Sequence, residues 1–281
     1  MPARVSSISC ALLALAFAPP FVAARTDTPK PDDARPSPAE LLTNLLARAA
    51  LVSTQGYRTQ FTFTKVRVTE ELDSKGKVTE KQESAFEVVP VNGRLFSRLV
   101  SENGKPATAK QRKAEEERER KLRAAAPPDP AAGKSPANSK RDYSVSPELL
   151  ERFTFATTGR EIVNGRDSWV LTFEPRSADL PVRKTADRFL NKVAGKVWID
   201  AAEHEIARIE VRLTDRVDLV AGIIASLKKF DMRFEQRRLE SGAWFNTLTE
   251  ASIEARQLVM NKRVHFTEKS GDFKKVAAPA K

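Results

Sequence analysis

The sequence predicts a mainly β protein of the α+β class, an antiparallel sheet covered by a few helices. Apolar and polar residues alternate over many short runs, which is the period of a half-buried strand. The pairs Asn92-Gly93 and Asn164-Gly165 stand between such runs and are strong hairpin signals. Few segments show helical spacing, so hairpins outnumber helices.

The composition excludes several classes of protein. The 281 residues include 48 Lys and Arg, 37 Asp and Glu, one Cys and two His, which gives a net charge of +11. One cysteine excludes an internal disulfide and a Cys-rich zinc site. Two histidines leave little room for a His-based metal cage or a His-driven triad. A hydrophobic share of 41% with 30% charged residues is that of a soluble globular protein.

Residues 1–24 are expected to be a cleavable signal peptide. Arg4 is followed by a short apolar stretch and then by the small residues Val22-Ala23-Ala24, which is the pattern of a secretory signal. The shortness of that stretch disfavours the alternative, a membrane anchor. Cleavage after Ala24 would remove Cys10 and leave a cysteine-free chain of net charge +10 in the periplasm. Residues 25–36, rich in Pro and Asp, are expected to be a disordered leader.

A helix and a three-stranded meander are expected next. Ser37-Pro38-Ala39-Glu40 is a capping box with Pro at the first helical position, and leucines at helical spacing continue toward Gly56. Beyond Gly56 the period becomes two. A change of parity near Thr64-Lys65 requires a bulge or a bend. The second and third strands are expected at 78–90 and 95–100.

Residues 105–142 are expected to be a charged, Ala/Pro-rich insertion in a loop. They hold 11 Lys and Arg against 6 Asp and Glu, about half of the positive excess. Lys110–Arg123 has i,i+4 charge pairs and no apolar face, which predicts a solvated helix. Ala124–Ser139 is expected to be disordered. The positive charge suits an anionic membrane surface or an acidic envelope partner, or it serves solubility, whereas export argues against nucleic acid.

After the insertion, a short helix from Ser146 and further hairpins are expected. The stretch Val217–Leu227 is apolar, with Gly222 in its middle. Three interpretations of it are open: a short buried helix, a mobile lip over a cavity, or a patch that touches acyl chains or a partner. The strands are expected at or near 153–163, 169–173, 196–200, 206–213, from 228, 244–255 and 258–266.

The sequence contains no catalytic constellation. The G-x-S-x-G, H-E-x-x-H, P-loop and G-x-G-x-x-G motifs are all absent. The nearest approach to a metal cluster falls within one hairpin turn, whose side chains are expected to face outward: Asp200, Glu203, His204 and Glu205. His265 is expected on a solvent face. We therefore expect no enzyme, no metal and no cofactor. A hydrolase would require His204 or His265 beside a serine and an acid in a cleft.

Aromatic residues distributed over many strands form the candidate ligand-binding site. The chain has 15 Phe and 3 Trp, and a curved sheet lined by such rings would enclose an apolar cavity. The alternative is that the rings pack an ordinary core. Together with two residues of the 217–227 stretch, the candidates are Phe61, Phe63, Phe86, Phe96, Trp169, Phe173, Trp198, Ile223, Ile224, Phe230 and Phe234.

One part of the sequence consists of the strand Gly195-Lys196-Val197-Trp198-Ile199-Asp200, a turn and the strand through Leu213. It resembles a recurring hairpin of the outer-membrane lipoprotein-sorting proteins, the LolA/LolB-like family. The resemblance covers about 37–275 without the insertion and leaves 276–281 as a tail. It implies a single domain whose strongly curved antiparallel sheet, an incomplete β-barrel, has helices on its concave side. Members hold lipoprotein acyl chains, or sense lipid and lipoprotein ligands, in the cavity between sheet and helices.

Two functional hypotheses follow from this resemblance. The first is a periplasmic protein that binds lipid or lipoprotein acyl chains in an apolar cavity, as an outer-membrane lipoprotein-sorting carrier does. The second is an envelope protein-interaction or sensor module that uses the same fold without lipid transport. A sheet whose cavity is filled by its own side chains would favour the second hypothesis.

Overall fold

The computed structural model describes residues 35–127, 146–177, 180–183, 185–220, 225–257 and 260–276. The expected signal peptide, nearly all of the leader, much of the Ala/Pro-rich part of the insertion, and Ile223 and Ile224 lie outside the described residues. Within the described ranges, no helix combines the length and the apolar character that crossing a membrane requires.

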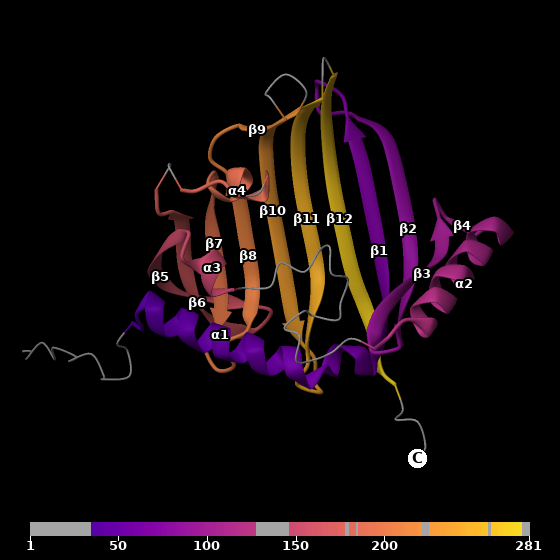
Figure 1. Ribbon diagram of the computed structural model, residues 1–281, viewed down its shortest axis with the longest axis horizontal. Coiled ribbons are helices and arrows are strands. Elements are labelled where there is room, and N and C mark those ends of the chain that lie inside the picture. Colours follow the sequence, from indigo (N-terminus) through magenta and orange to yellow (C-terminus); the bar gives the residue numbers. More distant parts are fainter. Residues whose placement is uncertain are drawn as a thin grey trace, which may run out of the picture. The chain divides into compact units, whose positions relative to one another are not determined.

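The described strands form one antiparallel sheet, which is curved and not closed (Figure 1). Its order is β4-β3-β2-β1-β12-β11-β10-β8-β7-β6-β5, and β9 pairs with β10 beside this path. The strands are β1 (Phe61–Leu72), β2 (Val78–Val91), β3 (Arg94–Glu102), β4 (Lys105–Pro106), β5 (Phe153–Val163), β6 (Arg166–Pro175), β7 (Val193–Asp200), β8 (Ile206–Leu213), β9 (Val217–Val220), β10 (Ala225–Arg238), β11 (Trp244–Gln257) and β12 (Met260–Lys275).

The described helices are few, and only two of them are long. The described helical elements are α1 (Pro38–Gln55), the 3₁₀ turn η2 (Tyr57–Gln60), α2 (Ala109–Ala124), α3 (Pro147–Leu150) and α4 (Thr185–Leu190). The Ser37 hydroxyl accepts the backbone N–H of Glu40 at 3.2 Å and caps α1 as expected. The prediction of a mainly antiparallel protein with a few helices is confirmed.

The two predicted Asn-Gly turns join strands as expected. Asn92 and Gly93 have φ values of 48° and 70°, and Asn164 and Gly165 have 51° and 77°. These left-handed conformations are those of a tight hairpin turn, which Asn and Gly adopt more readily than other residues. A third pair, Asn103-Gly104, joins β3 to the short β4 in the same way.

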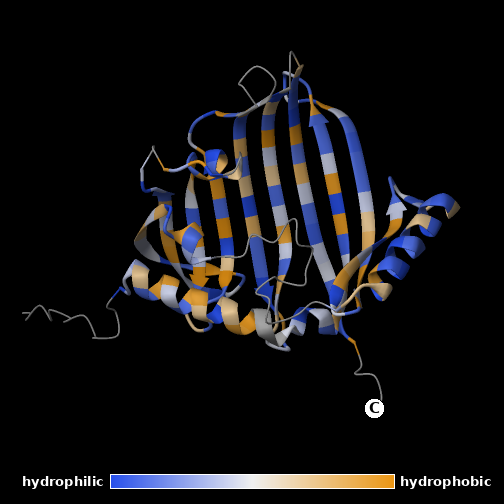
Figure 2. Cartoon of the chain, viewed as in Figure 1, coloured by the Kyte–Doolittle hydropathy of each residue, from blue (hydrophilic) through white to orange (hydrophobic). Residues whose placement is uncertain are grey.

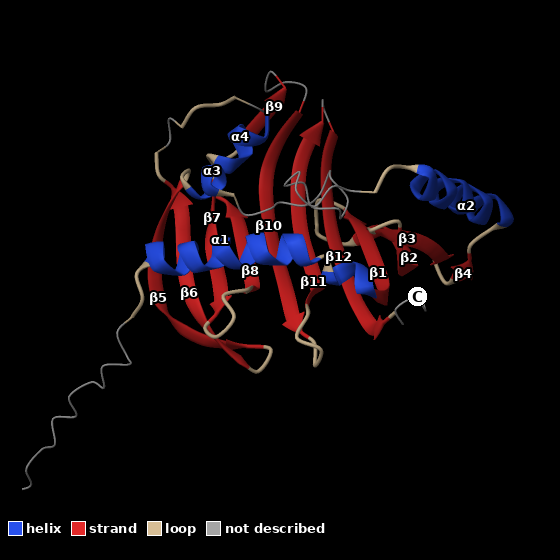
Figure 3. Cartoon of the chain, turned by 60° about the horizontal axis from the view of Figure 1, so that its bottom comes forward, coloured by secondary structure: helices blue, strands red, loops and turns tan. Residues whose placement is uncertain are grey.

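The sheet has one mainly apolar face, which we call the α1 face because α1 crosses it (Figure 3). Leu41 and Leu45 of α1 are buried against Leu171, Val197 and Ile199, which neighbouring strands bring into register on one side. The alternation of hydrophobic and hydrophilic residues along the strands is visible in Figure 2. This burial of apolar surface is what holds α1 on the sheet.

The opposite face has a smaller core of its own. Val170 and Trp198 are cross-strand neighbours there, and they pack with Val163, Ala207 and Trp244. The turn between β5 and β6 reaches across to β10, where the Asn164 side chain donates to the backbone carbonyl of Gln236 at 3.0 Å. The end of this hairpin therefore covers part of the opposite face.

Helix α2 packs against β2 and β3 through charged side chains. Arg98 of β3 binds Glu119 at 2.7 Å, and Arg118 lies over the Phe96 ring at 5.3 Å. The Asn92 side chain donates to the carbonyl of Ala125 at the end of the helix at 2.6 Å. No residue of α2 is buried, so the prediction of a solvated helix outside the core is confirmed.

The stretch 217–227 contains no helix among its described residues. Val217–Val220 is the strand β9, which pairs antiparallel with the start of β10 at Ala225–Leu227. The helical interpretation is therefore wrong for these residues, because their backbone groups pair between strands. The bulge expected near Thr64-Lys65 lies between Thr62 and Thr64, where the register of β1 and β12 shifts.

Candidate functional site

Most of the predicted aromatic candidates share the α1 face. Strand register links them across the sheet: Phe173 is aligned with Gly195, Val211, Met232 and Ala251 on successive strands. The candidates that register and alternation assign to the α1 face are Phe61, Phe63, Phe86, Trp169, Phe173, Phe230 and Phe234. Ile223 and Ile224 lie outside the described residues.

Two aromatic candidates lie on the opposite face. Trp198 is 3% exposed in the core with Trp244, and its Nε1 donates to Glu161 at 2.8 Å. Phe96 is 5% exposed beneath Arg118 of α2. The sequence showed that each belongs to a strand but not which side of that strand would meet α1, because this depends on register and bulges.

The rings on the α1 face form separate clusters. Where β1 and β11 begin, Phe61 and Phe63 pack around Phe245, with ring centroids 5.1 and 5.6 Å away. Near β5, Phe173 packs against Phe153 at 5.3 Å. Elsewhere, Phe230 packs against Phe189 of α4 at 5.1 Å, Trp169 lies under Arg160 at 4.6 Å, and Phe86 lies under Lys65 at 5.4 Å.

Between α1 and α4 the α1 face remains only half covered. Strands β8, β10, β11 and β12 present apolar side chains there that are neither fully buried nor fully exposed. These residues are Ile209, Val211, Phe230, Met232, Phe234, Ala251, Ile253, Val264 and Phe266. They form a continuous apolar surface on rigid strands, which we call the apolar strip.

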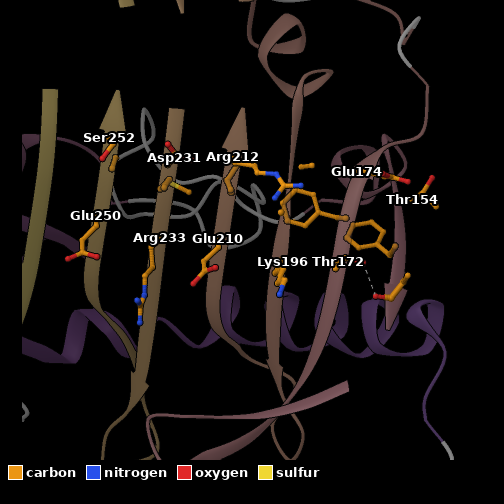
Figure 4. A pocket seen from close by; sticks show the side chains of 18 of the residues that line it. Thr154, Thr172, Glu174, Lys196, Glu210, Arg212, Asp231, Arg233, Glu250 and Ser252 are labelled. Carbon is orange, nitrogen blue, oxygen red and sulfur yellow. Dashed lines mark hydrogen bonds between the residues drawn. The ribbon is translucent and has the colours of Figure 1, made fainter. Parts of the chain in front are cut away.

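A pocket of about 600 Å³ lies on the opposite face (Figure 4). Two rows of polar side chains border it, and the backbone of β7, β8, β10 and β11 runs between them. One row consists of Lys196, Glu210, Arg233 and Glu250, and the other of Arg212, Asp231, Ser252 and His265. The lining is thus rich in charge, unlike the apolar cavity expected from the sequence.

The pocket contains the serine–histidine pair that a hydrolase would require. The Ser252 hydroxyl lies 3.2 Å from His265 Nδ1, and His265 Nε2 lies 3.4 Å from the Thr267 hydroxyl. His265 is half-buried in this pocket, on the face away from Val264 and Phe266. Its second nitrogen therefore meets a hydroxyl where a triad has a carboxylate. Ser252 also lies within a strand paired on both sides, so its backbone offers no preformed oxyanion hole.

The acidic turn between β7 and β8 binds arginines. Asp200 accepts hydrogen bonds from Nε and Nη2 of Arg166, at 2.7 and 2.9 Å, and the Arg48 side chain of α1 binds Glu205 at 2.8 Å. Arg238 bonds Glu203, whose other oxygen accepts Trp244 Nε1 at 2.9 Å. The expectation that these side chains face outward is wrong, because Asp200 and Glu205 are buried. No group of three potential metal ligands occurs in the part of the chain that the structure describes.

Burial acts differently on the pKa values of these two carboxyls. For Asp200, burial alone would raise the pKa, but Arg166 and the backbone N–H groups of Glu203 and Ala202 outweigh it and hold the pKa below its usual value. For Glu205, desolvation exceeds the attraction of Arg48, and the pKa is raised. Sequence reasoning missed Arg48 and Arg166, because single arginines far apart in the chain carry no signal of pairing.

No family model and no curated protein matches this chain. Among solved structures it is similar to a Vibrio parahaemolyticus domain described as an outer membrane lipoprotein-sorting protein, at 11% identity over 82% of this chain and 91% of that one, with a TM-score of 0.34. A LolA superfamily protein from Nitrosomonas europaea matches at 9% identity over 87% and 96%, with a TM-score of 0.31. The Pseudomonas aeruginosa MucA/MucB complex matches at 12% over 84% and 99%, with a TM-score of 0.24. The descriptions of two of these structures name the lipoprotein-sorting and LolA proteins that the sequence resembles.

Proposed function

We propose that this chain is an exported envelope protein that binds the acyl chains of a lipid or lipoprotein along the apolar strip. The observation that carries the proposal is the half-covered strip between α1 and α4, which spans four adjacent strands. Because paired strands already hold these apolar side chains in place, the protein loses little further conformational entropy when a ligand contacts them. Each methylene that leaves water for such a surface contributes about 0.8 kcal/mol.

The first 24 residues support export, with cleavage after Ala24 and delivery to the periplasm. This region carries the basic start, short apolar stretch and small residues of a secretory signal. Mass spectrometry of the protein recovered from the periplasmic fraction tests this part of the proposal. An N-terminus at Arg25 supports it, and recovery of the intact N-terminus in the membrane fraction contradicts it.

Displacement of a fluorescent fatty-acyl probe, combined with native mass spectrometry, tests acyl-chain binding. We expect the purified protein to bind the probe, and Ile253→Glu in the apolar strip to weaken binding at least tenfold because it places a charge beneath the chain. Val66→Glu is the matched control. Val66 is 38% exposed on the opposite face, so this variant should bind the probe as the unchanged protein does. Absence of both co-purified lipid and probe binding would contradict the proposal.

A second candidate, a protein-interaction or sensor module, is favoured by the outer edge of β5. This strand ends the sheet order, and its outer edge pairs with no other described strand. Such an edge offers hydrogen-bonding groups to an extended partner segment. Ile162, 68% exposed on β5, tests it. Ile162→Lys should abolish cross-links between this edge and an envelope protein while leaving acyl-probe binding unchanged, and cross-links that persist would contradict this candidate.

A further inference from the structure

The charged pocket on the face opposite α1 has no part in the proposed acyl binding. We propose that it binds a small zwitterion, whose anionic group contacts Lys196 and Arg212 and whose ammonium group contacts Glu210 and Glu250. Phosphoethanolamine has this chemistry, either as a soluble molecule or as the headgroup of a phospholipid. The proposal stands independently of the apolar strip.

Two cations of the pocket form no close ion pair with a described carboxylate. Lys196 of β7 is aligned with Glu210 of β8, and Arg212, two residues further along β8, is aligned with Ala194 on one side and with Asp231 of β10 on the other. Neither Lys196 nor Arg212 has a carboxylate oxygen within 4.0 Å among the described residues. Both side chains line the pocket (Figure 4). An anion that enters the pocket would therefore meet two positive charges that no described carboxylate pairs with at close range.

Two carboxylates of the pocket, Glu210 and Glu250, likewise form no close ion pair with a described residue, although Arg233 lies between them. Glu210 of β8 and Glu250 of β11 are each aligned with Arg233 of β10. Arg233, however, donates from Nε to Glu235 at 3.0 Å, and Glu235 also accepts Arg208 at 2.8 Å. Glu210 and Glu250 consequently have no Lys or Arg nitrogen within 4.0 Å in the described part of the chain.

The geometry of the sheet separates the charges by a length that suits a compact zwitterion. Adjacent strands lie about 4.8 Å apart, so the backbones of Lys196 and Glu210 are one strand spacing apart, and their charged groups lie more than 4.0 Å from each other. A ligand with a phosphate and an ammonium group two carbons apart can meet both. A simple anion lacks the second contact and is repelled by Glu210 and Glu250. Ser252 and His265 add hydrogen-bonding groups at the end of the second row.

Isothermal titration calorimetry of the full exported chain with phosphoethanolamine tests the site. We expect saturable binding, and at least tenfold weaker binding of inorganic phosphate and of ethylamine, each of which supplies one charge only. Arg212→Gln and Glu210→Gln should each weaken phosphoethanolamine binding at least tenfold. The matched controls are Arg120→Gln on α2 and Glu80→Gln on β2, which make the same charge changes outside the pocket and should leave binding unchanged.

Flotation with vesicles distinguishes the two sources of the ligand. Binding to phosphatidylethanolamine vesicles that Arg212→Gln and Glu210→Gln both abolish assigns the site to a lipid headgroup, whereas binding of soluble phosphoethanolamine alone assigns it to the soluble molecule. Inorganic phosphate binding as tightly as phosphoethanolamine, or indifference to Glu210→Gln, would overturn the zwitterion site, as would no binding of either form. Binding of the acyl probe reports on the apolar strip of the α1 face, so failure of the acyl-binding proposal and failure of the zwitterion proposal can be told apart.

Discussion

A single glycine shows how closely two strands of this sheet approach each other. A Cβ placed on Gly195 of β7 would lie 1.9 Å from the carbonyl oxygen of Glu210 and 2.8 Å from the Phe173 ring. Gly195 is not in the left-handed region, so the requirement is for space and not for backbone freedom. Phe173 thus packs over the position where any other residue would carry a side chain.

We predict that Gly195→Ala destabilises the fold by about 1–3 kcal/mol, the usual cost of overpacking a filled site. Gly159→Ala is the matched control, since a Cβ at Gly159 of β5 meets nothing within 4 Å. That substitution should leave the free energy of unfolding within about 0.5 kcal/mol of the unchanged protein. Urea unfolding followed by circular dichroism measures both. Equal effects of the two variants on the free energy of unfolding would show that the close contact at Gly195 does not determine stability.

At the scale of elements, α1 is held by an apolar stripe and by one arginine. Leu41 and Leu45 lie against the core of the α1 face, and Arg48, farther along the helix, binds Glu205 and approaches Glu203 to 3.7 Å. The leucines fix the helix on the sheet by burial, whereas Arg48 connects it to the turn between β7 and β8. The apolar strip begins where this cover ends.

Leu45→Ala should destabilise the protein by about 2–5 kcal/mol, because Leu45 is buried and its removal leaves a cavity beneath α1. Leu51→Ala on the same helix is the control. Leu51 is 48% exposed, and its truncation should cost much less. Thermal unfolding of both variants provides the comparison. If Leu45→Ala unfolds at the same temperature as Leu51→Ala, α1 does not contribute to the core.

The arrangement of elements was predictable where the signal was local. Asn92-Gly93 and Asn164-Gly165 identified two hairpins, Ser37 identified the start of α1, and the charge pattern of Lys110–Arg123 identified a solvated helix. Which residues share a face was less predictable. Trp198 and Phe96 were assigned to the same cavity as Phe173, but side-chain direction depends on pairing register, which alternation within one strand does not fix.

The charged pocket was not predictable, because it depends on strands brought together by the sheet. Lys196, Glu210, Arg233 and Glu250 are distributed over 55 positions of the sequence, and the sequence alone does not show that they form one row. Ser252 and His265 likewise become neighbours only through the pairing of β11 with β12. The α4 contact with Phe230 had no sequence signal either, because a helix of six residues is too short for periodicity.

For the molecule as a whole, buried carboxylates bound to arginine make stability depend on pH. The pKa values of Asp200 and Glu235 are lowered, although burial alone would raise both, because Arg166 and Arg233 respectively hold each carboxylate in its charged form. A lowered pKa in the folded state contributes stability above the unfolded pKa, and this contribution is lost as the pH falls through the folded value. The pKa of Glu205 is raised, so its contribution to stability has the opposite pH dependence and is lost as the pH rises above the ordinary pKa of a glutamate.

The free energy of unfolding should therefore fall as the pH drops below about 4, where unfolded carboxyls begin to protonate. Asp200→Asn should flatten this decline and lower stability at pH 7 by about 1–3 kcal/mol, since it removes the charged partner of Arg166, which is partly exposed and keeps Glu203 at 3.6 Å. Glu80→Gln, an exposed carboxyl on β2, serves as the control and should leave the profile unchanged. Urea unfolding between pH 3 and 8, a range of about 5 pH units, gives the profile. An unchanged slope in Asp200→Asn would contradict this account.

The position of β12 has a consequence for the order in which the chain can assemble. β1 and β12 are neighbours in the sheet, and Phe61 is aligned with Lys275. Within the sheet, the meander β1–β4 is therefore hydrogen-bonded to the strands β5–β11 only through β12. Closing so long a loop costs entropy that only the final pairing recovers. A chain built this way cannot complete its sheet before β12 is available, so we expect the pairing of β1 with β12 to form late in folding.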